Sequence, residues 1–188
     1  LGNTLSQTLS NLAGFDERKM GSAPGRPVIR GLGDERVLIL QDGIRSGDVS
    51  AQSSDHAVTI DPISAQEVEI ARGPQALAYG ANAIGGVINV VRNQIETTVP
   101  SKFTGSFTLN GESVSSGVSG ALDATIPYKD FALSLNLNGR LAGDVGTPLG
   151  EIDNTYYRST NDALGLSWVK SWGYLGAAFS TYINNYGI

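Results

Sequence analysis

The sequence VEIARGPQALAYGANAIGGVINVV, from Val68 to Val91, decides the fold. Apolar residues, many of them β-branched, occur at both ends and predict one strand over Val68–Ala71 and a second over Gly86–Val91. A Gly-Pro pair between them predicts a sharp turn, followed by a short helical turn over Gln75–Tyr79. Glycines then let the backbones approach closely where these elements cross.

The residues before this stretch predict a small mixed domain. Leucines at helical spacing predict a short helix over residues 5–12, and the polar, breaker-rich residues 15–25 predict a loop. Short strands are expected over Arg26–Arg30 and Arg36–Gln41. Ser46–Thr59 is a polar loop that is too long for a simple connection, so it is either functional or loose.

After about residue 100 the pattern changes to strict alternation of apolar and polar residues. The segment Phe103–Asn110 places Phe103, Phe107 and Leu109 on one face and threonine, serine and asparagine on the other. About five such strands are expected, at residues 103–110, 118–126, 131–140, 164–168 and 175–180.

The connections between these strands differ in length. Residues 127–130 and 171–173 predict tight turns, whereas Leu141–Thr160 is a long polar loop. Short turns on one side and long loops on the other are typical of an outer-membrane barrel, but the alternation alone fits a soluble antiparallel sandwich equally well. Aromatic residues near the short turns favour the barrel, because an interfacial aromatic girdle would lie there. These residues are Phe103, Tyr128, Phe131, Trp168, Trp172 and Tyr174.

Four motifs, in this order, resemble the plug domain of TonB-dependent outer-membrane receptors. They are RPVIRG at 26–31, LILQDG at 38–43, VEIARGP at 68–74 and YGANAIGGVINV at 79–90. The resemblance implies an α+β plug domain over residues 1–95, followed by antiparallel transmembrane β-barrel strands over residues 101–188. It also implies a bacterial outer-membrane location, contact with outer-membrane lipid, and active uptake driven by the TonB complex. No bond chemistry, and so no enzyme activity, is expected.

The chain is expected to be a fragment of such a receptor. About 8 strands make the smallest closed barrel, and an open sheet would expose unpaired edges to hydrocarbon. The segment that contacts the TonB complex is expected to be missing from this chain, as are the later barrel strands.

The composition of the chain argues against several kinds of partner, site and targeting segment. The 13 Lys and Arg residues against 18 Asp and Glu residues give a net charge of −5, and no basic run occurs, so no nucleic acid is expected as a partner. The absence of cysteine excludes thiolate metal sites and disulfides. No segment reaches the ~18 apolar residues of a membrane-spanning helix. The first residues lack the pattern of a signal peptide.

Several charged residues outside the polar loop Ser46–Thr59 are expected to have structural roles. We expect Arg30, Arg36 and Arg72, together with Glu67 and Glu69, to form ion pairs or to lie on sheet faces.

Three further charged residues are also expected to have structural roles. Asp42 is expected to be a turn residue before Gly43. Asp123 and Arg140 are expected on the polar face of the barrel strands.

The best candidate for a ligand site is Asp55 beside His56, the only histidine of the chain. A carboxylate and an imidazole in a polar loop can supply two ligands to a divalent ion such as zinc. The sequence SSDHAVTIDPISAQEVEIARGP, residues 53–74, also resembles the subgroup of these receptors that includes zinc-uptake receptors, which implies a metal site at Asp55 and His56. The remaining ligands would lie on absent barrel segments. The alternative is that Asp55 caps a turn and His56 is merely exposed.

Two kinds of function remain open on the sequence. The first is TonB-dependent uptake of a metal ion such as zinc or of a metal chelate, or else of a siderophore, haem or a cobalamin-type compound. The second is a plug-like module that binds metal or signals without transport. Zinc would be the transported ligand, and no resident cofactor is expected.

Overall fold

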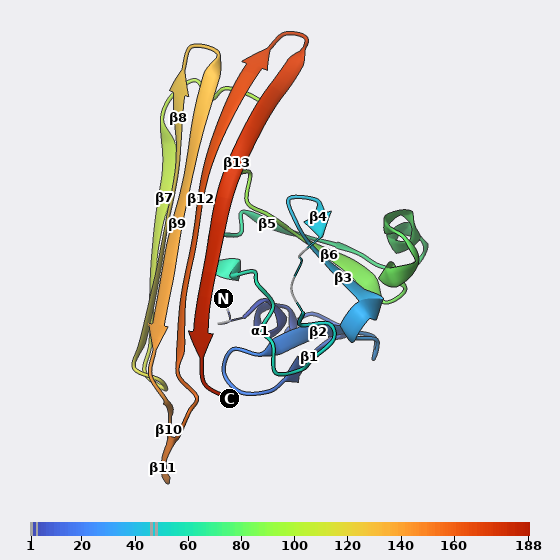
Figure 1. Ribbon diagram of the computed structural model, residues 1–188, viewed down its shortest axis with the longest axis vertical. Helices are drawn as coiled ribbons and strands as arrows, with labels where there is room; N and C mark the ends of the chain where they lie inside the picture. The colour runs from blue at the N-terminus through green and yellow to red at the C-terminus, as the bar shows by residue number, and fades with distance from the viewer. Residues whose placement is uncertain (1, 3, 46, 48) are drawn as a thin grey trace. The chain divides into compact units, whose positions relative to one another are not determined.

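The computed structural model describes residues 2, 4–45, 47 and 49–188, and its contacts divide the chain into two compact units. The first unit comprises residues 1–92 together with 153–156 and 186–188, and the second comprises residues 93–152 and 157–185. Figure 1 labels the strands of both units and the helix α1. No helix in the described part of the chain is long and apolar enough to cross a membrane.

A four-stranded mixed sheet in the order β4-β3-β6-β5 forms the centre of the first unit. It consists of β3 (Val37–Gln41), β4 (Ile44–Arg45), β5 (Glu67–Ala71) and β6 (Gly86–Val91). Strand β6 runs parallel to β3 and antiparallel to β5, with Ile88 opposite both Ile39 and Ile70. The strands predicted within the opening stretch are therefore confirmed.

A second, two-stranded sheet pairs β1 (Phe15–Lys19) with β2 (Gly25–Ile29). The prediction of a loop over residues 15–25 was wrong, because β1 lacks the apolar alternation of a strand and forms through backbone pairing with β2. The helix α1 (Leu5–Leu9) is shorter than predicted; the Thr4 hydroxyl caps it by accepting a hydrogen bond of 3.1 Å from the Gln7 amide.

Four short 3₁₀ helices complete the first unit. They are η1 (Asp34–Arg36), η2 (Pro62–Ser64), η3 (Gly73–Tyr79) and η4 (Ala81–Ala83). The Asp61 carboxylate caps η2 by accepting a hydrogen bond of 3.0 Å from the Ile63 amide. The predicted helical turn over Gln75–Tyr79 is present as part of η3.

The core of the first unit lies between α1, the β1–β2 hairpin and the mixed sheet. Gly86 shows why glycine is required in it: φ is +145°, and an added Cβ would lie 2.8 Å from Ile29 Cδ1 and 3.0 Å from the Ala71 carbonyl oxygen. The buried apolar side chains of this core are Leu5, Leu9, Phe15, Ile29, Val37, Ile39, Val58, Ile60, Ile88 and Val90.

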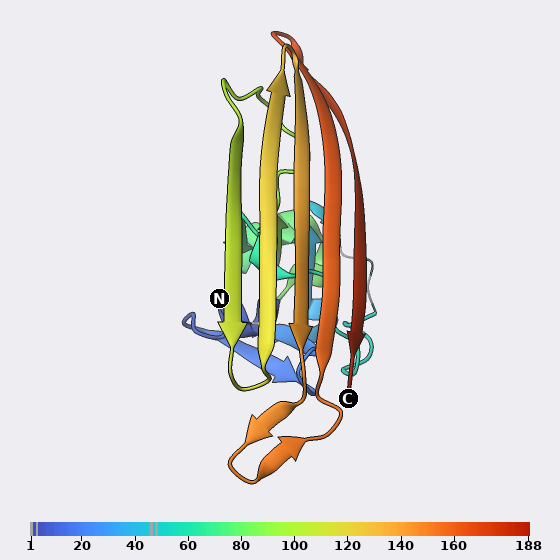
Figure 2. The same ribbon diagram turned by 90° about the vertical axis from the view of Figure 1, so that its left-hand side faces the viewer.

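Five long antiparallel strands in the order β13-β12-β9-β8-β7 form the second unit, and Figure 2 shows them side by side. Their bounds are β7 (Thr104–Glu112), β8 (Gly117–Tyr128), β9 (Phe131–Ala142), β12 (Tyr157–Lys170) and β13 (Gly173–Tyr186). The five strands expected from the alternation are confirmed. The segment predicted as one long polar loop contains a small hairpin, β10 (Val145–Thr147) with β11 (Gly150–Ile152), which is too short to show a pattern in the sequence.

The two faces of this sheet differ as the alternation predicts. Apolar side chains such as Phe107, Leu109 and Leu164 are exposed on one face, whereas Asn136 and Asn161 are buried on the other. Aromatic rings gather beside the short turns: Phe131 stacks on Trp168 with centroids 6.5 Å apart, and Trp172 meets Trp168 edge-on at 5.7 Å.

The linker segment, residues 94–96, lies against the polar face of the same sheet. Its Glu96 amide donates a hydrogen bond of 2.8 Å to the Ser167 hydroxyl of β12, and the Glu96 carboxylate accepts one of 3.0 Å from Thr125 of β8. A Cβ added at Gly165 would lie 1.8 Å from the Gln94 carbonyl oxygen. A glycine is therefore required where the linker segment crosses β12.

Candidate functional site

The candidate loop, residues 49–57, is built from consecutive turns. The amides of Gln52 and Ser53 both donate to the Val49 carbonyl, at 3.0 and 3.1 Å. The His56 amide then donates to the Ser53 carbonyl at 3.3 Å. These turns bring the side chains of Ser53, Asp55 and His56 to one place, so the loop has the defined geometry that a binding site needs.

The side chains of Asp55 and His56 contact each other directly. His56 Nδ1 lies 3.2 Å from Asp55 Oδ1, and the two side chains are 46% and 44% exposed respectively. The Ser53 hydroxyl donates a hydrogen bond to the same carboxylate oxygen. A carboxylate and an imidazole are thus adjacent and open to solvent, which suits the first two ligands of a divalent ion.

Tyr186 fixes the backbone of this pair. Its hydroxyl donates a hydrogen bond of 3.0 Å to the Asp55 carbonyl and accepts one of 3.2 Å from the Ala57 amide. Tyr186 ends β13 and belongs by its contacts to the first unit. Sequence reasoning missed it, because no local pattern relates two residues so far apart in the chain.

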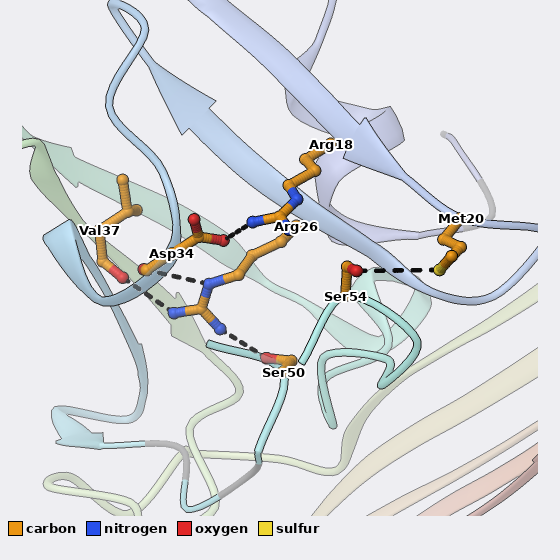
Figure 3. Close-up of polar contacts among 7 residues, drawn as sticks. All are labelled: Arg18, Met20, Arg26, Asp34, Val37, Ser50 and Ser54. Carbon is orange, nitrogen blue, oxygen red and sulfur yellow. Dashed lines mark hydrogen bonds and ion pairs between the residues drawn. The ribbon is translucent and has the colours of Figure 1, made fainter. Parts of the chain in front are cut away.

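The loop also contacts the sole methionine. Ser54 Oγ lies 3.8 Å from the Met20 sulfur, and Figure 3 shows the two side chains pointing toward each other. The contact brings a thioether, which is a soft metal ligand, to the edge of the loop. Within the described residues, no three His, Asp or Glu side chains gather closely enough to hold a metal ion. Completion of a metal site therefore depends on further ligands.

The pKa of Asp55 is lowered, chiefly by the hydrogen bond from Ser53, then by a backbone hydrogen bond, with smaller contributions from His56. A lowered carboxylate pKa means that the charged, metal-binding form persists to lower pH. We predict that Ser53→Ala raises the pKa of Asp55, so that protonation of this carboxylate begins at a higher pH. A ¹³C NMR titration of aspartate-labelled receptor, with the Asp55 signal assigned by Asp55→Asn, measures the change. An unchanged titration in Ser53→Ala would contradict it.

Several other charged residues have the structural roles expected of them. Asp42, with φ of +48°, sits in the turn before Gly43 and accepts a hydrogen bond of 2.7 Å from the Arg92 amide. The Glu69 carboxylate accepts one of 2.7 Å from Asn89 on the neighbouring strand. Arg72 donates to the Ala13 carbonyl at 3.2 Å, and its guanidinium lies 5.4 Å from the centroid of the Phe15 ring.

A mixed four-stranded sheet with short helices, followed by antiparallel strands with one apolar face, fits a plug domain followed by the start of a barrel. The family model described as "TonB-dependent Receptor Plug Domain" matches residues 2–87. Residues 2–87 therefore match a TonB-dependent receptor plug domain, and the antiparallel strands that follow have the fold of the start of such a receptor's barrel.

The relatives transport different ligands. The chain is 42% identical over 82 residues to a hemin receptor of Yersinia enterocolitica, covering 43% of this chain and 12% of that protein. It is 34% identical over 123 residues to the vitamin B12 transporter BtuB of Vibrio cholerae, covering 61% of this chain and 20% of that protein. The copper transporter OprC shares the fold with a TM-score of 0.84 at 19% identity, over 99% of this chain and 29% of that one. The chain thus spans less than a third of each of these relatives.

Receptors with this architecture reside in the bacterial outer membrane and are transporters rather than enzymes. The outer-membrane location that the motifs implied is therefore confirmed by the comparisons. The relatives do not single out zinc, so the ligand is a matter of proposal.

Proposed function

We propose that the receptor to which this chain belongs takes up a metal ion such as zinc, or a metal chelate, across the outer membrane. The observation that carries this proposal is the contact between Asp55 and His56, with Ser53 holding the carboxylate charged and Tyr186 holding the backbone. Because the Asp55 and His56 side chains are already held next to each other, less conformational entropy is lost when a metal ion binds them. In this proposal, residues of the barrel supply the remaining ligands.

Uptake requires that the bound ligand be released inward. A ligand held tightly by one state of the plug leaves only when another state, with lower affinity, becomes populated. In the proposed cycle, the TonB complex supplies this change by pulling on the N-terminal side of the plug. The apolar face of the barrel strands contacts outer-membrane lipid, as its exposed leucines and phenylalanines favour.

A second candidate is uptake of haem. It is favoured by the hemin receptor of Yersinia enterocolitica, which is 42% identical over 82 residues of the plug region. A histidine in an exposed loop can also serve as an axial ligand of haem iron. Siderophore or cobalamin-type uptake is a third choice. A module that binds metal without transport is less favoured, because the relatives are named as receptors and transporters.

Parallel calorimetric titrations of the full-length receptor with zinc, hemin and cobalamin test the proposal. Zinc should bind with one site per receptor, and the organic ligands should show no saturable heat. Tight binding of hemin or cobalamin without binding of zinc would contradict uptake of a free metal ion and identify the haem or cobalamin-type alternative. Detergent micelles without receptor serve as the control, because hemin partitions into detergent.

A further inference from the structure

Arg26 joins three separate elements of the plug through one buried side chain. It lies on β2 and is only 8% exposed. Its guanidinium donates to the Asp34 carbonyl at 3.2 Å, to the Val37 carbonyl at 3.1 Å and to the Ser50 hydroxyl. Figure 3 shows these contacts converging on the guanidinium group. One side chain therefore connects the β1–β2 hairpin to η1, β3 and the candidate loop.

The contact with Ser50 lies at the start of the loop that carries the candidate metal ligands. Ser50 is itself buried, at 3% exposure, and precedes the turns that position Asp55 and His56. At the other end of the loop, Tyr186 holds the Asp55 carbonyl and the Ala57 amide. The loop is thus held by Arg26 near its start and by Tyr186 near its end, and Arg26 belongs to the N-terminal hairpin.

The hairpin is a separate unit of backbone pairing. Strands β1 and β2 form their own two-stranded sheet, which shares no strand with the mixed sheet. A segment paired only with itself can detach from a domain while the rest stays folded. A force applied from the N-terminal side reaches β1 and β2 before it reaches any strand of the mixed sheet, because both precede β3 in the chain.

We propose that Arg26 is a latch that holds the metal-binding loop in its binding arrangement and opens when the hairpin is pulled away. Withdrawal of β2 removes these three guanidinium contacts together, including the one that links Ser50 to the hairpin, so Arg26 no longer restrains the loop. Asp55 and His56 then no longer form a fixed pair, and affinity for the metal falls. Arg26 is thus a positioning residue that couples movement at the N-terminal side to release. This inference rests on the proposed uptake function.

The test compares hydrogen–deuterium exchange of the loop in the full-length receptor and three variants. In Arg26→Met and Ser50→Ala, exchange over residues 50–57 should become about tenfold faster, since a charged hydrogen bond contributes on this order to local opening. Arg18→Met is the matched control: Arg18 lies on the same hairpin and pairs with the Asp34 side chain instead of the loop. The double variant Arg26→Met/Ser50→Ala should exchange no faster than either single variant. The latch proposal would be overturned if residues 50–57 exchanged at the wild-type rate in both single variants. It would also be overturned if Arg18→Met accelerated their exchange as much as Arg26→Met does.

Coupling to the hairpin is tested by Phe15→Ala, which removes a buried ring from β1 and leaves Arg26 in place. In this variant, the amides of the loop and the hairpin amides of residues 15–29 should both exchange faster than in wild type, and by similar factors. A loop that stays protected while the hairpin exchanges would overturn the coupling.

Zinc titration of the same variants separates this inference from the proposed function. Zinc affinity should fall about tenfold in Arg26→Met and Ser50→Ala, as for residues that orient metal ligands, and stay unchanged in Arg18→Met. Arg26→Lys should recover part of the affinity, because it keeps the charge without the three-way geometry. If zinc affinity is unchanged in the latch variants although wild type binds zinc, the latch does not position the site. If wild type binds no zinc, the uptake proposal fails, and the exchange experiment still decides whether the latch exists.

Discussion

Replacing Asp55 and His56 together with alanine is expected to abolish zinc binding by the full-length receptor, with affinity lowered on the order of 100-fold or more. The two side chains are adjacent, with His56 Nδ1 at 3.2 Å from Asp55 Oδ1, so the double variant removes both proposed ligands from one point. The effect should exceed that of the latch variants, because a ligand bonds the metal directly, whereas Arg26 acts through the loop. Calorimetric titration with zinc measures the loss.

Gln52→Ala is the matched control for this variant. Gln52 is exposed in the same loop and takes part in its turns through its backbone amide, which alanine retains. Its zinc affinity should equal that of wild type. Asp55→Asn and His56→Gln should each weaken binding separately, since each removes one ligand and preserves approximate side-chain size. Wild-type affinity in the double variant would show that Asp55 is a turn residue and His56 an exposed side chain.

Gly165→Val is expected to prevent assembly of the folded receptor. A Cβ at this position would lie 1.8 Å from the Gln94 carbonyl oxygen, a separation that no pair of unbonded atoms sustains. The obstructing atom is backbone, so rotation of a side chain gives no relief. Either β12 or the linker segment must move, and the hydrogen bond from the Glu96 amide to Ser167 breaks. Overpacking commonly costs about 1–3 kcal/mol, and a backbone clash should lie above that range.

The heat-dependent mobility of the receptor on a gel measures the folded fraction in outer-membrane preparations. Gly139→Val is the control, because Gly139 lies on β9 of the same sheet and an added Cβ would meet its nearest atom at 3.8 Å. It should assemble normally, since β-branched residues suit strands. Normal assembly of Gly165→Val would show that the linker segment does not lie against β12.

Local sequence patterns were sufficient to predict the strands whose apolar residues form runs or alternate with polar ones, and the position where the backbone requires glycine. The strands β5 and β6 followed from apolar runs, and the requirement for Gly86 followed from the close crossing that its positive φ and its contact with Ile29 confirm. The five long strands followed from their period of two, because one face meets polar groups and the other remains apolar.

Local sequence patterns did not predict the strands that form only through backbone pairing with a neighbouring strand. Strand β1 has the sequence FDERK, whose charges obscure any alternation, and it exists because β2 supplies its backbone partners. The hairpin of β10 and β11 has three paired residues on each side, which is too few for a period to show. Neither element could be predicted from its own sequence, because each depends on backbone hydrogen bonds to a partner strand.

For the candidate site, the sequence by itself determined the chemistry and the tertiary structure decided the geometry. Asp55 and His56 were evident because they are neighbours in the chain and because a carboxylate and an imidazole are metal ligands whatever the fold. Tyr186 and the latch residue Arg26 were not, because their contacts with the loop span 131 and 24 positions of the chain. Hydrogen bonds depend on the distance and direction between atoms, and for residues so far apart only the folded backbone sets both.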